Sequence, residues 1–170
     1  MQNQSDDILE NLTFVNGKEE VEEVIVSTGI DPGLIELEVT ESALMADFDQ
    51  TRNVLLALSS LGLSLALDDF GTGYSSLSYL RQFPLNVLKI DRSFIKDMDT
   101  EPQALDIVTA IVRLGNCLNM VLVAEGLETE LQFHSLRQLG CEYGQGYYMC
   151  KPISEDEFTE RFLNQAPIMT

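Results

Sequence analysis

The feature that most constrains the fold is a regular alternation of short aliphatic segments with longer segments of helical pattern. Five segments have the length and aliphatic composition of β-strands: residues 34–40, 63–67, 86–90, 120–125 and 142–148. Helical patterns occupy the intervening and flanking stretches: residues 19–27, 43–61, 75–82, 102–118, 128–139 and 154–163. Because a helix between two strands carries the chain back to the same end of the sheet, this order predicts parallel strands.

The sequence predicts an α/β fold of about five parallel strands alternating with helices, and two architectures satisfy it. One is an incomplete TIM-like (β/α) barrel with an open edge, because a closed eight-stranded barrel typically needs ~250 residues and this chain has 170. The other is a doubly wound open sheet, which a chain of this length can form without any missing part. The strands consist of nearly continuous apolar residues, so we expect them to be buried on both faces.

Composition and charge exclude several classes of protein. Hydrophobic residues make up 45% of the chain and charged residues 22%, which provides enough apolar surface for a folded core. The 28 acidic residues outnumber the 10 lysines and arginines, and the formal charge of −18 makes a nucleic-acid polymer an unfavourable partner. We expect no membrane segment and no signal peptide, because no stretch has the required length and apolar character. Three cysteines without paired spacing fit reduced thiols, so we expect a cytoplasmic protein.

Charged and amide side chains recur at the carboxyl ends of the predicted strands. They are Glu38, Asp68, Asp69, Lys89, Asp91, Glu125, Glu128 and Gln145. In parallel α/β proteins the carboxyl ends of the strands meet at one edge, where ligands bind. We therefore expect these residues, which lie far apart in the sequence, to face a single site.

Several carboxylates can share a site in ionised form only when a cation neutralises them. Oxygen ligands without histidine or cysteine suit Mg²⁺ or Mn²⁺, and two such ions activate water for in-line displacement at phosphorus. Lys89 would then orient the attacking water or screen the phosphate charge. Spacing alone leaves alternatives open, because Lys89 also fits a surface lysine or a Schiff-base lysine, and the acids fit the caps and loops of a non-catalytic α/β domain.

Five short motifs follow one another along the chain. They are LEVTES at 37–42, LDDFGTGYSS at 67–76, LKID at 88–91, AEGLE at 124–128, and QGY at 145–147 followed by Lys151 and Pro152. In order and spacing these motifs resemble the EAL domain family, bacterial phosphodiesterases of the second messenger cyclic di-GMP, over about residues 20–163. The resemblance implies a TIM-like barrel fold and hydrolysis of cyclic di-GMP to linear pGpG with Mg²⁺ or Mn²⁺.

The resemblance also implies a role for each matching residue. The metal ligands would be Glu38, Asp68, Asp69 and Glu125. The catalytic residues would be Glu125 and Lys89. Lys89 would contact the nucleophilic water. Residues near the metal or the substrate would be Glu41, Asp91, Glu128 and Gln145. Glu41 would steady the loop that couples the metal site to dimerisation in the family: Phe70, Gly71, Thr72, Gly73, Tyr74, Ser75 and Ser76.

One signature of the family is absent, because the tripeptide Glu-Ala-Leu occurs nowhere in the chain. In the family its glutamate is a metal ligand, and a nearby arginine helps to hold the nucleotide phosphate. The asparagine that the family uses as a further ligand matches either Asn3 or Asn11, and the sequence leaves that choice open. We therefore expect a polar, poorly ordered segment over residues 1–18, a truncated EAL domain over 19–165 and a tail over 166–170.

These departures predict a phosphodiesterase domain with impaired activity and weakened binding of metal and cyclic di-GMP. One alternative is a non-catalytic module that senses cyclic di-GMP or binds another protein, and another is a shortened gene product with no independent role. Strands missing from a barrel leave unpaired sheet edges, which favour pairing with another chain. We therefore expect a homodimer or a swapped oligomer.

Overall fold

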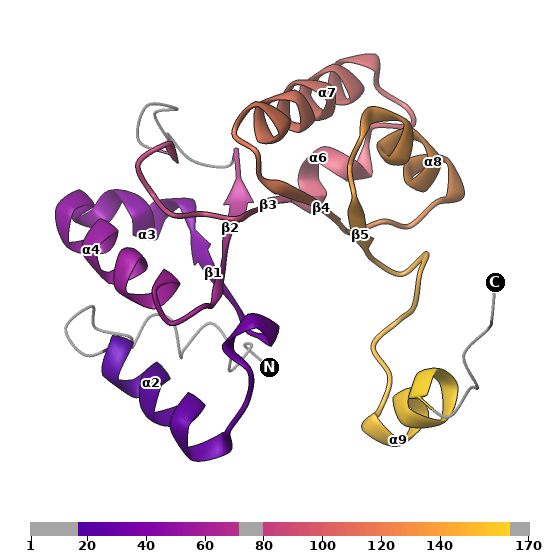
Figure 1. Ribbon diagram of the computed structural model, residues 1–170. Coiled ribbons are helices and arrows are strands. Elements are labelled where there is room, and N and C mark those ends of the chain that lie inside the picture. Colours follow the sequence, from indigo (N-terminus) through magenta and orange to yellow (C-terminus); the bar gives the residue numbers. More distant parts are fainter. Residues whose placement is uncertain (1–16, 72–79, 164–170) are drawn as a thin grey trace.

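A parallel sheet of five strands organises the chain (Figure 1). The computed structural model describes residues 17–71 and 80–163. The strands are β1 (Glu36–Thr40), β2 (Ser64–Phe70), β3 (Val87–Ile90), β4 (Val121–Glu125) and β5 (Tyr143–Gln145). They lie side by side in chain order, and each pairs in parallel with the next, so the predicted α/β fold of alternating strands and helices is confirmed.

Helices connect the strands and flank the sheet (Figure 1). They are α2 (Gly17–Thr28), α3 (Glu41–Ala46), α4 (Phe48–Ser59), α6 (Arg92–Lys96), α7 (Pro102–Cys117), α8 (Glu130–Leu139) and α9 (Glu155–Phe158), with a 3₁₀ turn η1 (Pro32–Leu34) and a π-helical turn η2 (Thr159–Leu163). None of these described helices is long and apolar enough to cross a membrane. The helix predicted over 75–82, the segment 1–18 and the tail 166–170 fall largely or wholly outside the described residues.

Three helical segments differ from the prediction. The single helix predicted over residues 43–61 is two helices, α3 and α4, because Asp47 has an extended backbone with φ −148° and ψ 99°. The Asp47 carboxylate then begins α4 by accepting a hydrogen bond from Gln50 N at 3.1 Å. The helix predicted over 154–163 is α9 followed by η2. The sequence pattern does not predict α6, because 5 residues are too few to show a helical period.

The two faces of the sheet differ in what covers them. Alternate strand residues point to opposite faces, and the register pairs Leu67 with Leu88 and Leu88 with Leu122 on one face. All three leucines are fully buried. They belong to one hydrophobic core with apolar residues of α4, α6 and α7, so this face carries most of the packing that stabilises the fold.

The opposite face, called the open face below, carries both polar and apolar residues. By register its members are Glu36, Glu38, Thr40, Ser64, Ala66, Asp68, Val87, Lys89, Val121, Val123, Glu125, Tyr143 and Gln145. Ala66, Val87 and Lys89, in its centre, are buried. Tyr143 is 63% exposed and Val121 36%. The prediction that the strands are buried on both faces is confirmed for β3, in which every residue is buried. It is wrong for β1 and β5. Each of these two is an edge strand of the described sheet, with a neighbour on one side only.

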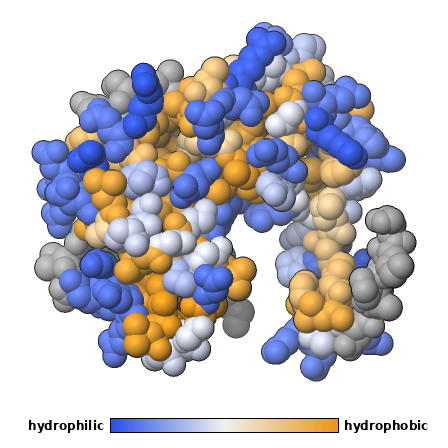
Figure 2. Space-filling model, viewed as in Figure 1, coloured by the Kyte–Doolittle hydropathy of each residue, from blue (hydrophilic) through white to orange (hydrophobic). Residues whose placement is uncertain are grey.

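A hollow separates two parts of the surface that expose apolar residues (Figure 2). On one side, α2 and the turn after it expose Val24, Val26 and Leu34. On the other side, α9 and η2 expose Phe158 and Phe162, whose ring centroids lie 5.1 Å apart. An extended segment connects β5 to α9, and α9 packs mainly against η2 (Figure 1). These apolar surfaces lie beside the hollow and are available for contact with other chains.

The thiol of Cys141 is expected to resist alkylation in the folded chain. Burial raises its pKa from 9.0 to about 11, and its side chain hydrogen-bonds to Tyr143 O at 3.3 Å. Cys117, by contrast, is exposed. We expect iodoacetamide at about pH 8 to modify Cys117 and to spare Cys141 until the chain unfolds, because the thiolate is the reactive form. Peptide mass spectrometry measures each site, and equal modification of both in the folded chain would contradict the buried position of Cys141.

The same shift gives Cys141 a pH-dependent effect on stability. The folded state favours the neutral thiol of Cys141. Its contribution to the free energy of unfolding is therefore fully present below pH 9.0 and is lost as the pH rises toward about 11. Comparison of urea unfolding of the parent and Cys141→Ala across this interval measures the effect.

Candidate active site

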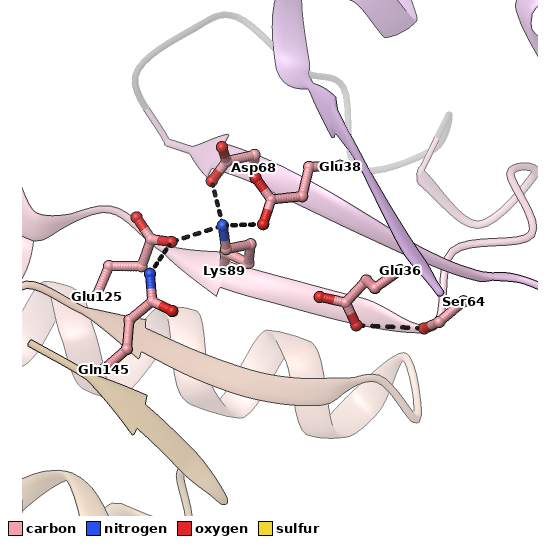
Figure 3. Close-up of polar contacts among 7 residues, drawn as sticks. All are labelled: Glu36, Glu38, Ser64, Asp68, Lys89, Glu125 and Gln145. Atoms are coloured by element: carbon pink, nitrogen blue, oxygen red, sulfur yellow. Dashed lines mark hydrogen bonds and ion pairs between the residues drawn. The ribbon is translucent and has the colours of Figure 1, made fainter. Parts of the chain in front are cut away.

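One polar side chain from each of the five strands lies in a row across the open face (Figure 3). The row consists of Glu38 on β1, Asp68 on β2, Lys89 on β3, Glu125 on β4 and Gln145 on β5. These residues come together because the strands are parallel and in register, so that their carboxyl ends lie at one edge. The fold thus gathers in one place five residues that are distant in the sequence.

Lys89 is the centre of this row. Its side chain is only 7% exposed, and its Nζ atom lies 2.5 Å from Glu38 Oε1, 2.6 Å from Glu125 Oε1 and 3.5 Å from Asp68 Oδ1 (Figure 3). Gln145 Nε2 donates a hydrogen bond to Glu125 Oε1 at 3.0 Å and extends the row to β5. Removing the charge of Lys89 would leave these three carboxylates facing one another without a counter-charge, which is costly.

The surroundings shift the pKa of two members of the row. Burial by itself would lower the pKa of Lys89, but hydrogen bonds to Glu125 and Glu38 and the nearby negative charges raise it above its ordinary value. Burial raises the pKa of Glu125, and the Lys89 ammonium opposes that rise without cancelling it. Lys89 is therefore a fixed positive charge at neutral pH.

Asp68 has an unsatisfied oxygen. Its Oδ1 atom is buried and has no hydrogen-bond partner among the described residues, although Lys89 Nζ lies at ion-pair distance. A buried carboxylate oxygen without a donor, beside two other carboxylates, suits a hard cation such as Mg²⁺ or Mn²⁺. Within residues 17–71 and 80–163, however, no three acidic, histidine or cysteine side chains already surround a metal position. The ammonium of Lys89 lies between the carboxylates instead.

Glu41 contacts the start of the loop after β2. Its residue is 3% exposed, and its Oε2 atom accepts a hydrogen bond from Gly71 N at 3.0 Å. Gly71 has φ +95°, and a Cβ atom there would lie 2.9 Å from the ring of Phe94. Asp69 has φ +53° at an irregularity in the β2–β3 register. Phe70 and Gly71 are the described part of the predicted loop, and the rest lies outside the described residues: Thr72, Gly73, Tyr74, Ser75 and Ser76.

Asp91 and Glu128, which the sequence also places near the site, lie outside the row. Asp91 caps α6 by accepting a hydrogen bond from Ser93 N at 2.9 Å. Burial would raise the pKa of Asp91, but hydrogen bonds from Ser93 and the adjacent backbone lower it below its ordinary value. Glu128 is exposed and lines a groove of about 960 Å³ beside the row, together with Glu125 and Gln145. The groove gives the row an open approach for a ligand of nucleotide size.

Sequence reasoning does not single out Gly146, which holds Gln145 in position. A Cβ atom at Gly146 would lie 2.2 Å from both the N and the O atom of Leu127. This close approach allows Leu127 N to donate to Gln145 O at 3.1 Å and Tyr148 N to donate to Leu127 O at 2.9 Å. The glycine in the QGY motif is the available signal, since glycine is the residue that lets two backbone segments come so close.

The fold and the row together define an α/β protein of the (β/α)-barrel class, with an acidic site at the carboxyl ends of its strands. The family model for the EAL domain matches residues 9–152. The chain belongs to the EAL domain family.

Known proteins show how far this similarity extends. The cyclic di-GMP phosphodiesterase NbdA of Pseudomonas aeruginosa is 47% identical over 143 residues, which cover 84% of this chain and 18% of NbdA. The structure of the PaMucR phosphodiesterase in complex with c-di-GMP superposes with a TM-score of 0.82 at 40% identity, covering 86% of this chain and 59% of that one. The manganese and cyclic di-GMP complex of BlrP1 from Klebsiella pneumoniae superposes with a TM-score of 0.71 at 34% identity, covering 78% of this chain and 34% of that one.

Two conclusions follow from these matches. The five-stranded sheet corresponds to part of the TIM barrel of EAL domains, so the barrel-type architecture is confirmed in preference to a doubly wound sheet. The chain spans about a fifth of the length of the curated relatives it matches.

Proposed function

We propose that this chain is an EAL-type phosphodiesterase domain that hydrolyses cyclic di-GMP to linear pGpG with Mg²⁺ or Mn²⁺. The observation that carries the proposal is the row on the open face, in which Glu38, Asp68 and Glu125 surround the buried ammonium of Lys89. Carboxylate oxygens and a fixed positive charge are what metal-assisted displacement at phosphorus needs. The relatives support the proposal, since NbdA is named a cyclic di-GMP phosphodiesterase and BlrP1 was solved with manganese and cyclic di-GMP.

Each residue of the site has a task in this proposal. The oxygens of Glu38, Asp68, Asp69 and Glu125 would hold the divalent cations, and the unsatisfied Oδ1 atom of Asp68 supports that assignment. Bound divalent cations supply positive charge against the phosphodiester and lower the pKa of water. Lys89 carries three ammonium hydrogens and would orient the attacking water with one of them.

We also propose that activity is lower than in EAL domains that contain the Glu-Ala-Leu motif, which this chain lacks. The side chain of Glu38 is 44% exposed, against 19% for Glu125 and 7% for Lys89, so water reaches the β1 end of the row. Water at that end screens the interactions of the site and weakens cation binding. We place the EAL-type domain at residues 19–165, with Asn3 or Asn11 as the candidate for a further ligand.

Turnover of cyclic di-GMP tests this function. We expect pGpG to form when the purified chain is incubated with cyclic di-GMP and Mn²⁺, and we expect none in EDTA, because the acidic row by itself repels the phosphates. Chromatography separates the substrate from the product. A folded chain that binds Mn²⁺ but forms no pGpG would show that it is not a phosphodiesterase by itself.

A non-catalytic module is the second candidate, and one observation favours it. The Lys89 ammonium already occupies the space between Glu38 and Glu125, two of the proposed metal ligands. Such a module would bind cyclic di-GMP weakly, or would bind another protein through the loop at residues 70–76 and the exposed sheet edge. Equilibrium dialysis separates the candidates, because cyclic di-GMP binding without pGpG formation favours sensing over hydrolysis.

We propose further that the chain forms a homodimer or a swapped oligomer. Within the described sheet β1 and β5 each pair on one side only, and unpaired strand edges favour association. Exposed Val26, Phe158 and Phe162 add apolar surface that association would bury. Size-exclusion chromatography with light scattering is expected to give at least twice the chain mass of 19.0 kDa. A monomer at every concentration tested would contradict this assembly.

A further inference from the structure

Lys89 occupies a position that a metal ion would need. Its ammonium lies 2.5 Å from Glu38 Oε1 and 2.6 Å from Glu125 Oε1, and these oxygens belong to two of the proposed metal ligands (Figure 3). Glu38 comes from β1 and Glu125 from β4, on opposite sides of the strand that carries Lys89. One cation therefore links carboxylates that the backbone holds on separate strands.

The charges explain how this row can exist without a metal. Glu38, Asp68 and Glu125 place three carboxylates within 3.5 Å of a single ammonium. Carboxylates gathered in this way repel one another unless a cation lies between them. Lys89 provides that cation, and with its side chain 7% exposed it is little screened by solvent.

We propose that Lys89 is the built-in counter-ion of the metal-free chain, and that a divalent cation binds Glu38 and Glu125 by displacing its ammonium group. The inference rests on the proposed metal-dependent function. Two positive charges a few ångströms apart repel strongly in a partly buried site, so both cations cannot use the same two oxygens. The long, flexible side chain of lysine can withdraw while β3 stays in place. Asp68 Oδ1 has no hydrogen-bond partner among the described residues, so it is available as a further ligand of the divalent cation.

Displacement also connects the two tasks of Lys89. While the ammonium is paired with Glu38 and Glu125, two of its three hydrogens are engaged. Once a divalent cation takes over these oxygens, the hydrogens are free for the water or the phosphate of the proposed reaction. Lys89 would then act on the substrate only when the metal is bound.

Mn²⁺ binding measured by isothermal titration calorimetry tests the displacement, with Lys89→Met compared with the parent chain. Methionine keeps a long unbranched side chain and removes the positive charge. We expect Lys89→Met to bind Mn²⁺ at least ~10-fold more tightly, because the competing cation is gone. Lys18→Met is the matched control, because Lys18 lies on α2, outside the groove beside the row, and its ion pair at 3.9 Å is with Glu22. Its affinity for Mn²⁺ is expected to equal that of the parent.

Thermal unfolding provides a second readout and detects a folding defect. In EDTA, Lys89→Met is expected to melt below the parent, because its carboxylates then repel one another. Saturating Mn²⁺ is expected to raise the melting temperature of Lys89→Met more than that of the parent. Lys89→Arg keeps the positive charge, so its Mn²⁺ affinity is expected to be no higher than that of the parent.

The outcomes separate this inference from the proposed function. Equal or weaker Mn²⁺ binding by Lys89→Met than by the parent would overturn the counter-ion role and leave phosphodiesterase activity to the turnover assay. Mn²⁺ binding by neither chain would overturn both. Tighter binding by Lys89→Met, combined with no pGpG from the parent, would support the counter-ion role and reject catalysis.

Discussion

Replacing Glu125 by glutamine is expected to lower the rate of pGpG formation by about 10²–10³-fold. Glutamine keeps the size of the side chain but removes the negative charge that lies 2.6 Å from Lys89 Nζ and that would hold the cation. Gln145 Nε2, which donates to Glu125 Oε1 at 3.0 Å, would then compete with Lys89 for a single amide oxygen. Initial rates at saturating Mn²⁺, with pGpG separated by chromatography, measure the effect.

Asp106→Asn is the matched control for this variant. Asp106 is an exposed acid on α7, and the substitution removes the same charge at a distance from the row. Its rate is expected to equal that of the parent, and circular dichroism should show both variants folded. A parental rate in Glu125→Gln would mean that hydrolysis takes place elsewhere than in the row.

Replacing Gly146 by alanine is expected to lower the free energy of unfolding by about 3 kcal/mol. The new Cβ atom would lie 2.2 Å from the backbone N and O atoms of Leu127, and backbone atoms cannot move aside as the end of a side chain can. The two backbone segments must move apart to relieve the clash, and this movement breaks the hydrogen bonds that Leu127 makes with Gln145 O and Tyr148 N. Urea unfolding followed by circular dichroism measures the loss.

Gly29→Ala separates this clash from the general cost of replacing a glycine. Gly29 has φ +68°, but a Cβ atom there would meet nothing within 4 Å. Gly29→Ala is therefore expected to lower the free energy of unfolding by only about 1 kcal/mol, from backbone strain. Equal losses in the two variants would show that the contact between Gly146 and Leu127 does not hold the end of β5 in place.

The strands are the part of the fold that the sequence predicts best. The predicted strand over residues 86–90 is Val87–Ile90 in the structure, and the one over 120–125 is Val121–Glu125. Both are short aliphatic runs between turn-forming residues, so the signal is local. The row follows from them, because parallel strands bring their carboxyl ends to one edge and each predicted strand carries a polar residue there.

Other features depend on contacts between distant segments and escaped sequence reasoning. Asp47 caps α4 and so divides the single helix predicted over residues 43–61. The helical spacing of apolar residues continues across Asp47 and does not reveal the break. Asp91 follows a strand, as a ligand would, but its carboxylate caps α6. The prediction of burial on both faces is wrong for β1 and β5, which are the edge strands of the described sheet. In β1, Glu36 and Glu38 alternate with Leu37 and Val39, which is the pattern of a strand with one polar face.

The sequence by itself determined which chemical groups stand at the strand ends, since composition and local period fix the strands and their last residues. Only the tertiary structure decided which groups touch. Lys89 is 51 residues from Glu38 in the sequence, yet the two form the shortest ion pair of the row. They meet because only β2 lies between their strands, β1 and β3, in the sheet. That Lys89 lies between the carboxylates, where a metal would bind, depends on burial and on the balance of charge at one point in space. No local pattern of residues encodes that balance.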